Sequence, residues 1–316
     1  MTNARAPKIF ATRPLVSVLI LAYNHGRYIQ QAIESILSQV TDFAIEVVIA
    51  EDCSTDETLS ISKKFVDLSP EIVRVVTGDT NVGMMKNLRR GIAGCRGEFI
   101  ALCEGDDFWV DAFKLATQVN GLRRHPEIDF CLTRGLMSYP DGSFGYSSGL
   151  GDCERILRLA DLLGTGTSIQ TASFLFRARS IRDLPDWFDS APVGDLFLIV
   201  ASVRMTGGAL YQPAITACYR VLTDGSWTQR MKQRSAEYYV LHSEAMIKAY
   251  ESAEECFDVP RKMLRYHVSG YYWLVAKDRL RKLHVVDCIT YIIRIDIAFI
   301  IERFVFRARS CFVSSL

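Results

Sequence analysis

The sequence predicts an α/β protein whose sheet is mostly parallel and flanked by helices, followed by a helical extension. Within the first 125 residues, apolar runs typical of strands alternate four times with helical apolar stripes. A polar cluster follows three of the four apolar runs, and the pattern after residue 230 is helical with few breakers. Repeated alternation of strand and helix is typical of a parallel sheet covered by helices on both faces.

Each expected element in this first part has its own local signal. The first strand, 15–22, is a nearly continuous apolar run, as expected for a strand covered on both faces. The further strands are expected at 43–50, 72–76 and 97–103. Helices are expected at 28–39, from about 54 to 67, at 81–93 and at 111–124, where apolar residues recur at helical spacing.

Polar residues gather where these strands end. Tyr23-Asn24 follows the first strand, Glu51-Asp52 the second, and the acidic stretch 104–107 the fourth. Because the loops after parallel strands lie along one edge of the sheet, we expect these three clusters to converge on a ligand site. Competing nucleotide motifs are absent, since no GxGxxG follows the first strand and no GxxxxGK[ST] occurs.

The acidic stretch Glu104-Gly105-Asp106-Asp107 is the most informative of the three. Burying closely spaced carboxylates without a positive partner is costly, so a cation is expected beside them. Oxygen ligands of this kind suit Mg²⁺ or Mn²⁺, with phosphate completing the coordination shell. A solvated acidic turn after a core strand is the simpler alternative.

Composition narrows the class of protein. The net charge of +1 gives no basic field, so we expect no nucleic-acid partner. Nine scattered cysteines without a CxxC pair favour a reducing compartment. The polar start of the chain is unlike a signal peptide, and no run of 18 apolar residues predicts a transmembrane helix. A cytoplasmic location is therefore expected.

After residue 125 the pattern changes, which suggests a second half of the same domain. A strand is expected at 128–138, a loop at 139–151, and a helix from Val193-Gly194-Asp195 to about 205. One or two short strands broken by Pro213 are expected at 209–219. We therefore expect a domain at 1–230, with halves at about 15–125 and 126–230, and a helical extension at 231–316.

Seven motifs in this order carry a resemblance to a known family. They are VSVLILAYNHGRYI, VVIAEDCSTDET, NVGMMKNLRRGI, GEFIALCEGDDFW, GTSIQTASFLFRA, DWFDSAPVGDLFLIV and YRVLTDGSW. Together they span the first 227 residues, which resemble bacterial glycosyltransferases of family 2 with the GT-A fold. The resemblance implies inverting transfer of a sugar from a nucleotide sugar, usually a UDP-sugar, to an acceptor hydroxyl in surface glycan synthesis.

The resemblance also implies a role for individual residues. Tyr23 lies at the position that stacks on uracil, and Asp52 at the position that accepts from the N3–H of the base. The nucleotide-binding set implied in this way is Ala22, Tyr23, Asn24, Asp52, Asn81, Glu104 and Asp106. The motif EGDD, a variant of DxD, implies Asp106 and Asp107 as ligands of a divalent metal, Mn²⁺ or Mg²⁺.

The remaining implied roles concern the acceptor side. Asp195 holds the position of the general base, a role that suits a carboxylate that must deprotonate an incoming hydroxyl. The acceptor and closing segment is implied at Thr171, Arg177, Arg220 and Trp227. The chain departs from the family at Leu222, where many relatives carry a histidine that can reach the metal or the diphosphate. Either the metal has one protein ligand fewer, or Asp224 takes part, or the alignment with the family shifts at this position.

Simpler interpretations of these residues stay open at this point. Asp195 could only cap a helix, Asp52 could bond to its own turn, and Tyr23 could be a core aromatic. Trp227 could serve packing, and Arg177 could form a surface ion pair. Two other functions also stay open: a sugar-1-phosphate nucleotidyltransferase, and a nucleotide-sugar-binding or scaffold protein without turnover.

The expected helix at 285–309 is apolar on two sides. Ile293, Ile297 and Ile301 line one side on a helical wheel, and Ile295 and Phe299 line the opposite side. Two apolar faces need two partners, of which one is the preceding helix.

The second face of this helix could meet the catalytic domain, a second subunit or a membrane. Arg303, Arg307 and Arg309 lie beside it, which motivates the hypothesis of peripheral contact with the inner face of a cell membrane, where lipid-linked acceptors are found. Contact through 285–309 is thus one expectation, and a homo-oligomer is another.

Overall fold

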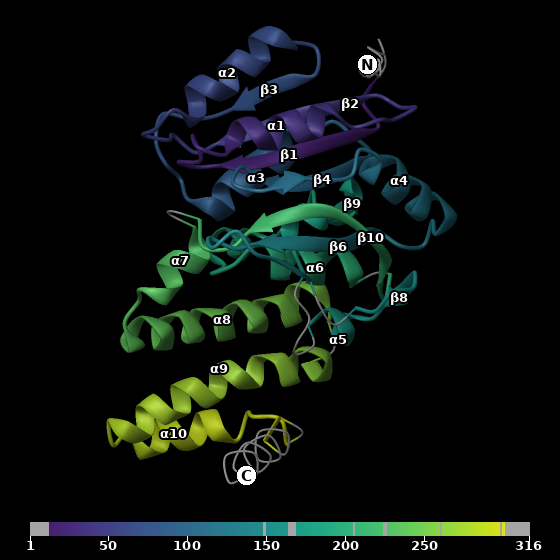
Figure 1. The fold of residues 1–316 in the computed structure, drawn as a ribbon. Coiled ribbons are helices and arrows are strands. Elements are labelled where there is room, and N and C mark those ends of the chain that lie inside the picture. Colours follow the sequence, from purple (N-terminus) through teal and green to yellow (C-terminus); the bar gives the residue numbers. More distant parts are fainter. Residues whose placement is uncertain are drawn as a thin grey trace. The chain divides into compact units, whose positions relative to one another are not determined.

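A computed structural model describes residues 13–147, 150–163, 169–204, 206–223, 226–259, 261–297 and 299–300. Two compact units result: residues 1–189 with 193–232, and residues 190–192 with 233–316. The first unit contains the sheet (Figure 1), and the described residues of the second unit form helices. The expected division into a catalytic domain at 1–230 and a helical extension at 231–316 stays a prediction.

In the described part of the first unit, ten strands form one mixed sheet, ordered β3-β2-β1-β4-β9-β6-β10-β5, with β7 beside β6 and β8 beside β10. The strands are β1 (Val16–Ala22), β2 (Ile45–Glu51), β3 (Val73–Val76), β4 (Phe99–Glu104), β5 (Phe108–Trp109), β6 (Phe130–Ser138), β7 (Phe144–Tyr146), β8 (Arg155–Leu157), β9 (Leu175–Arg177) and β10 (Ala209–Arg220). β1 to β4 pair in parallel, as the sequence predicts, whereas β9 is antiparallel to both β4 and β6.

Helices connect these strands in the expected alternation. Those of the first unit are α1 (Ile29–Leu37), α2 (Thr58–Leu68), α3 (Met84–Gly94), α4 (Lys114–Arg124), α5 (Leu159–Leu162), α6 (Asp195–Val203) and α7 (Trp227–Lys232). The side chains of α1 and α4 share one apolar core with alternate residues of β1, β2 and β4. α3 packs on the opposite face, where a Cβ at Gly91 would lie 2.5 Å from Leu19 Cδ1, so glycine is needed there.

Two expectations differ from the structure in the second half of this unit. β10 is one continuous strand through Pro213, and a register shift against β6 between Gln212 and Ile215 accommodates the proline. A bulge of this kind removes the need for a proline N–H in the ladder. β9 was not expected, because three residues that pair between two neighbours leave little periodic signal in the sequence.

The second unit consists of α8 (Ala236–Phe257), α9 (Arg261–Arg281) and α10 (Val285–Ile292). α9 contacts both α8 and α10 (Figure 1). In place of one helix at 285–309, the structure has α10 at Val285–Ile292, followed by a turn at 293–295 and described residues up to 300. Residues beyond 300 lie outside the described part. No helix among the described residues is both long enough and apolar enough to cross a membrane.

A buried lysine beneath the sheet is an unexpected feature of the first unit. Lys114 is fully buried, its Nζ donates to Gln118 Oε1 at 2.6 Å, and it lies 4.4 Å from the centre of the Trp109 ring. Burial lowers the pKa of Lys114 to about 7. Because a buried ammonium loses its hydration, the folded protein favours the neutral amine.

We predict that Lys114 makes the stability of the protein depend on pH. Between pH 7 and the usual lysine value, the unfolded chain binds a proton that the folded chain does not, so the free energy of unfolding rises with pH. Lys114→Met should flatten this rise in urea unfolding measured at several pH values across that window. Lys63→Met, at an exposed position of α2, is the matched control. Equal pH slopes for both variants and the wild type would contradict the prediction.

Candidate active site

The carboxyl ends of β1, β2 and β4 meet at one edge of the sheet. Ala22 pairs with Glu51 and Leu21 with Glu104 in the register of these strands. Beyond the ladders, Asp52 N donates to Ala22 O at 2.9 Å and Gly105 N donates to Leu21 O at 2.8 Å. The three polar clusters expected to converge are therefore adjacent in the structure.

A pocket of about 540 Å³ lies at this edge, within the first unit. Eight residues expected at the site line it: Ala22, Tyr23, Asp52, Asn81, Glu104, Asp106, Thr171 and Asp195. Segments far apart in the chain thus meet around one cavity, which is the arrangement expected of a ligand site. Asn24, Asp107, Arg177 and Arg220 do not line the pocket.

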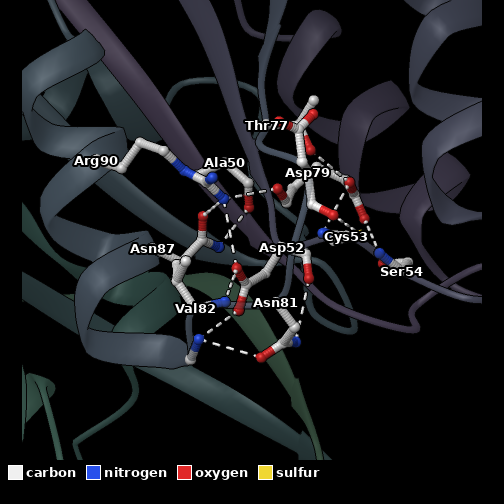
Figure 2. A network of polar contacts seen from close by, with 12 residues as sticks. Ala50, Asp52, Cys53, Ser54, Thr77, Asp79, Asn81, Val82, Asn87 and Arg90 are labelled. Carbon is white, nitrogen blue, oxygen red and sulfur yellow. Dashed lines mark hydrogen bonds and ion pairs between the residues drawn. The ribbon is translucent and has the colours of Figure 1, made fainter.

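Asp52 holds the loop between β3 and α3 in place (Figure 2). Its two carboxylate oxygens accept from Val82 N at 3.0 Å and Gly83 N at 2.9 Å, and Arg90 lies 3.4 Å from Oδ1. Asn81 Nδ2 donates to the backbone carbonyl of Asp52 at 3.1 Å. Asp52 therefore binds a neighbouring loop rather than its own turn. A carboxylate offers about four acceptor sites, so capacity for one further donor in the pocket remains.

The loop after β1 is fixed by contacts to the loop after β2. Asn24 has a positive φ of 56°, and its Oδ1 accepts from Thr55 N at 2.9 Å. Asn24 N donates to Ser54 Oγ at 3.0 Å, and Glu51 accepts from Ser54 N at 2.7 Å. The structure therefore places Asn24 in the support of the site and not on its wall. Tyr23, beside it, is 39% exposed and faces the pocket.

In the acidic turn after β4, Asp106 points into the pocket. Its Oδ2 accepts from Thr223 Oγ1 at 2.7 Å, and its Oδ1 lies 3.8 Å from His25 Nε2. His25 packs so closely on the turn that a Cβ at Gly105 would lie 2.7 Å from His25 Nδ1. Glycine at 105 thus allows the imidazole to lie beside Asp106.

Asp107 points the other way, into the protein. It is fully buried, and its Oδ1 accepts from Arg220 N at 2.9 Å. Burial and the charges of Asp106 and Glu104 raise the pKa of Asp107 well above its usual value. The expectation that Asp107 is a metal ligand is therefore not supported by its placement, because its carboxylate supports the turn from behind the pocket wall.

Arg220 supplies the positive charge that the acidic turn requires. Its guanidinium donates to the carbonyl of Asp106 and to Gln31, and it lies 4.4 Å from the ring centre of Phe108. A planar guanidinium suits this combination of hydrogen bonding and stacking. The structure places Arg220 behind the turn, which corrects the expectation that it closes over the donor and acceptor.

Three carboxylates, from Glu104, Asp106 and Asp195, face the same cavity. Burial, followed by the charges of Asp106 and Asp195, raises the pKa of Glu104 to about 8. Burial also raises the pKa of Asp195, although its own backbone N–H and that of Leu196 act in the opposite direction. The raised pKa values show that this cavity disfavours further negative charge, so an anionic ligand is favoured there when a cation enters with it.

Asp195 is the first residue of α6, as its sequence context predicts. Its Oδ1 accepts from Leu196 N at 2.8 Å. Gly194 before it packs on α3, since a Cβ there would lie 2.9 Å from Met85 Cε. The start of α6 is thereby fixed against α3, with the carboxylate of Asp195 in the pocket.

The donor set of this pocket fits a divalent metal that binds together with a ligand. Among the described residues, no group of three or more His, Cys, Asp or Glu side chains could hold a metal ion. Mg²⁺ and similar ions are commonly held by one or two carboxylates together with substrate phosphates. Asp106 and Glu104 both line the pocket, and Asp106 Oδ1 lies 3.8 Å from His25 Nε2. These two carboxylates offer such a partial shell.

Two expected residues of the acceptor segment are placed differently or not described. Arg177 is the last residue of β9 and pairs with Phe99 at the start of β4. Its side chain donates to Leu122 O at 2.7 Å, pairs with Glu98 at 3.3 Å and stacks on Phe99. It is remote from the carboxyl end of that strand, so we do not retain it at the site. Trp227 begins α7, but its side chain lies outside the described part, as does Asp224.

Several pocket residues were not predicted from the sequence. His25, Gln170, Thr228 and Arg230 supply polar groups to the lining. His25 and Gln170 lie inside two of the seven motifs, which gave them no role of their own. Thr228 and Arg230 lie beyond the last motif, so only the fold brings them to the cavity.

Comparison with known proteins identifies the family. The model of "Glycosyl transferase family 2" matches residues 17–184, which is more than half of the chain. The chain belongs to this family. The match contains β1 to β4 and the acidic turn, so the family-2 glycosyltransferase assignment covers the segments that form the nucleotide side of the pocket.

Individual relatives are similar over parts of their length. An uncharacterized protein of Mycobacterium tuberculosis is 35% identical over 214 residues, which are 67% of this chain and 60% of that protein. The chain thus spans about 60% of the length of this curated relative. Chondroitin synthase of Escherichia coli is 38% identical over 96 residues, which are 30% of this chain and 13% of that enzyme.

Solved structures show the same fold. TarS of S. aureus in complex with UDP has a TM-score of 0.56 and 18% identity, over 83% of this chain and 70% of that one. A mannosyltransferase from Pyrobaculum calidifontis in complex with GDP-Man and Mn²⁺ has a TM-score of 0.55 and 17% identity, over 87% and 77% of the two chains. The family-2 glycosyltransferase described here therefore has the GT-A fold.

The hydrogen bonds of Asp52 lead to a prediction about stability. Asp52→Asn keeps the shape of the side chain but turns one acceptor into a donor, so the N–H of Val82 or Gly83 loses its partner. We expect the free energy of unfolding in urea to fall by about 1–3 kcal/mol. Asp79→Asn, on the exposed surface of the same loop, should leave it unchanged. Equal stability of the two variants would show that Asp52 does not hold this loop.

Proposed function

We propose that this glycosyltransferase transfers a sugar from a nucleoside diphosphate sugar, with UDP as the nucleotide, to an acceptor hydroxyl with inversion at the anomeric carbon. The observation that carries the proposal is the shared pocket. It brings Tyr23 and Asp52, which suit a base, together with the carboxylates of Glu104, Asp106 and Asp195. One cavity thus combines residues that suit a nucleobase, carboxylates that suit a metal, and a candidate general base.

The nucleotide lies at the end of the pocket formed by the loops after β1, β2 and β3. Tyr23 offers an exposed ring for stacking, and Asp52 retains an acceptor site for an N–H of the base. Asn81 lines the same end. The titles of similar structures support a nucleotide-sugar donor, since TarS binds UDP and UDP-GlcNAc and the mannosyltransferase binds GDP-Man.

Asp106 would hold a divalent cation, Mn²⁺ or Mg²⁺, that enters with the donor. When bound, it neutralises the charge that develops on the departing diphosphate. Glu104 contributes to the ribose side, and Asp107 keeps the turn in position through Arg220. A structural neighbour in complex with GDP-Man and Mn²⁺ supports the metal. Thr223 fixes Asp106 Oδ2, which leaves Oδ1 facing the pocket.

Asp195 acts as the general base. Its carboxylate takes the proton of the acceptor hydroxyl while the hydroxyl oxygen forms a bond to the anomeric carbon. The bond from that carbon to the diphosphate breaks on the opposite side, and the nucleoside diphosphate leaves. The raised pKa of Asp195 makes its carboxylate a better proton acceptor than an ordinary aspartate. Because the hydroxyl oxygen attacks the anomeric carbon in a single displacement, opposite the leaving diphosphate, the configuration at that carbon is inverted.

The acceptor is a saccharide or lipid-linked saccharide of bacterial surface glycan synthesis. Thr171, in the short 3₁₀ turn 171–173, lines the pocket, and Trp227 is the first residue of α7. The enzyme acts on the cytoplasmic side of the membrane, with peripheral contact through its C-terminal helices, and a homo-oligomer is compatible with this role.

A protein that binds the nucleotide sugar without turnover is the second candidate. Leu222 favours it, because this residue has a left-handed φ of 60° and provides no imidazole to the metal. The neighbouring Thr223 binds Asp106 instead. The two candidates differ in whether the donor is consumed.

Asp195→Asn is the test of the proposed reaction. The amide cannot accept the proton, so donor turnover in the presence of Mn²⁺ should fall by about 10²- to 10⁴-fold, while UDP still binds. Asp186→Asn, at an exposed position before α6, is the matched control and should retain turnover. Turnover that survives Asp195→Asn would remove the residue from this role, and absence of turnover in the wild type across a panel of UDP-sugars would favour the binding protein.

A further inference from the structure

The turn between α9 and α10 presents a group of exposed aliphatic side chains. We call these residues the α10 patch: Leu283, Val285, Val286, Ile289, Ile293 and Ile297. Their exposed fractions lie between 53% for Val285 and 83% for Leu283. Single exposed aliphatic residues are ordinary, but several within fifteen positions of one helix and its flanks form a patch that needs a partner.

The patch is not the face that α10 uses for packing within its own unit. Cys288 and Ile295 are buried, and Tyr291 lies 6.2 Å from Tyr272 of α9 between ring centres. Asp296 N donates to Ser269 Oγ of α9 at 2.8 Å, which fixes the segment after α10 against the same helix. The expected contact with the preceding helix is therefore present, and the α10 patch belongs to the second apolar face.

Basic residues flank the patch on the side of α9. Lys277, Arg279, Arg281 and Lys282 lie within six positions, with Asp278 as the single acidic residue among them. Lys277 and Arg281 are exposed, and Lys282 pairs with Asp278 at 3.1 Å while half of its side chain stays exposed. Arg279 pairs with Glu244 of α8, and Asp287 is an exposed acidic residue within the patch, so the local excess of positive charge comes from the exposed Lys277, Arg281 and Lys282.

We infer that the α10 patch and these flanking cations form a docking surface for a bilayer that contains anionic lipids. Aliphatic side chains at this position enter the boundary between headgroups and acyl chains, and the cations meet the lipid phosphates. The aliphatic and cationic groups are adjacent along the chain, as a lipid interface requires. This inference does not depend on the proposed reaction.

The charges distinguish this partner from a second copy of the chain. A two-fold symmetric contact would place the same surface on both sides, so the exposed Lys277 and Arg281 of one copy would approach those of the other. Like charges opposed across an interface disfavour association. An anionic lipid surface instead satisfies the aliphatic and the cationic groups together.

The surface differs from the one expected from the sequence alone. That expectation relied on Arg303, Arg307 and Arg309, which lie outside the described residues. In the described part, the cations come from the end of α9, Lys277 to Lys282, and the aliphatic residues come from both sides of the α9–α10 turn.

Flotation of the full-length protein with liposomes tests the docking surface. Vesicles of phosphatidylcholine alone are compared with vesicles that also contain phosphatidylglycerol, at low and high salt. The variant Val286→Glu with Ile293→Glu places charges at two exposed positions of the patch, where folding does not require the aliphatic side chains. Leu68→Glu, at a position of α2 that is 77% exposed, is the matched control in the other unit. Thermal unfolding of all three proteins checks that they fold.

The wild type should float with phosphatidylglycerol vesicles, less at high salt, and hardly with phosphatidylcholine alone. The double variant should lose about tenfold or more of its partitioning, whereas Leu68→Glu should behave as the wild type. Failure of the wild type to float with either vesicle, or equal flotation of the double variant, would overturn the inference. A wild-type dimer in light scattering that becomes monomeric in the double variant, with no flotation of either, would assign the patch to a second copy.

Discussion

The pocket depends on the contact between Arg220 and the acidic turn after β4. Arg220 is the last residue of β10, and its backbone N–H and guanidinium bind Asp107 and the carbonyl of Asp106. This contact joins the C-terminal half of the first unit to the turn that carries the acids. Asp107 accepts the hydrogen bond from Arg220 N inside the protein, whereas the carboxylate of the neighbouring Asp106 lines the cavity. Two neighbouring aspartates therefore have opposite roles, one in support and one on the pocket wall.

The electrostatics of the site follow from this division. Glu104, Asp106 and Asp195 face one cavity; burial raises the pKa of both Glu104 and Asp195, and the charges of Asp106 and Asp195 raise the pKa of Glu104 further. Such a site is costly to maintain for the fold alone, because carboxylates at close range are stable only with a counter-charge. A nucleotide diphosphate would add further negative charge. A divalent cation reconciles the two, since it attracts both the carboxylates and the phosphates.

Much of this could be predicted from the sequence where a local pattern matches a local structure. The alternation of apolar runs and helical stripes predicted β1 to β4 and their helices, and the order of the strands then placed Asp52 and Asp106 at one edge. Long-range contacts could not be predicted in this way. Asp107 and Arg220 are 113 positions apart, and nothing in the EGDD motif tells which aspartate turns inward. Arg177 was misplaced for a related reason, since β9 is antiparallel to β4 and carries it to the opposite end of that strand.

Calorimetric titration of the protein with UDP, with and without Mn²⁺, tests most directly whether the acidic pocket requires a cation. UDP should bind at least about tenfold more tightly when Mn²⁺ is present, and Asp106→Asn should remove this gain in affinity. Asp107→Asn should mainly lower the free energy of unfolding and should change the gain from Mn²⁺ less than Asp106→Asn does. Equal affinity for UDP without the metal, or a gain that survives Asp106→Asn, would contradict the assignment of the pocket to a metal-bound nucleotide.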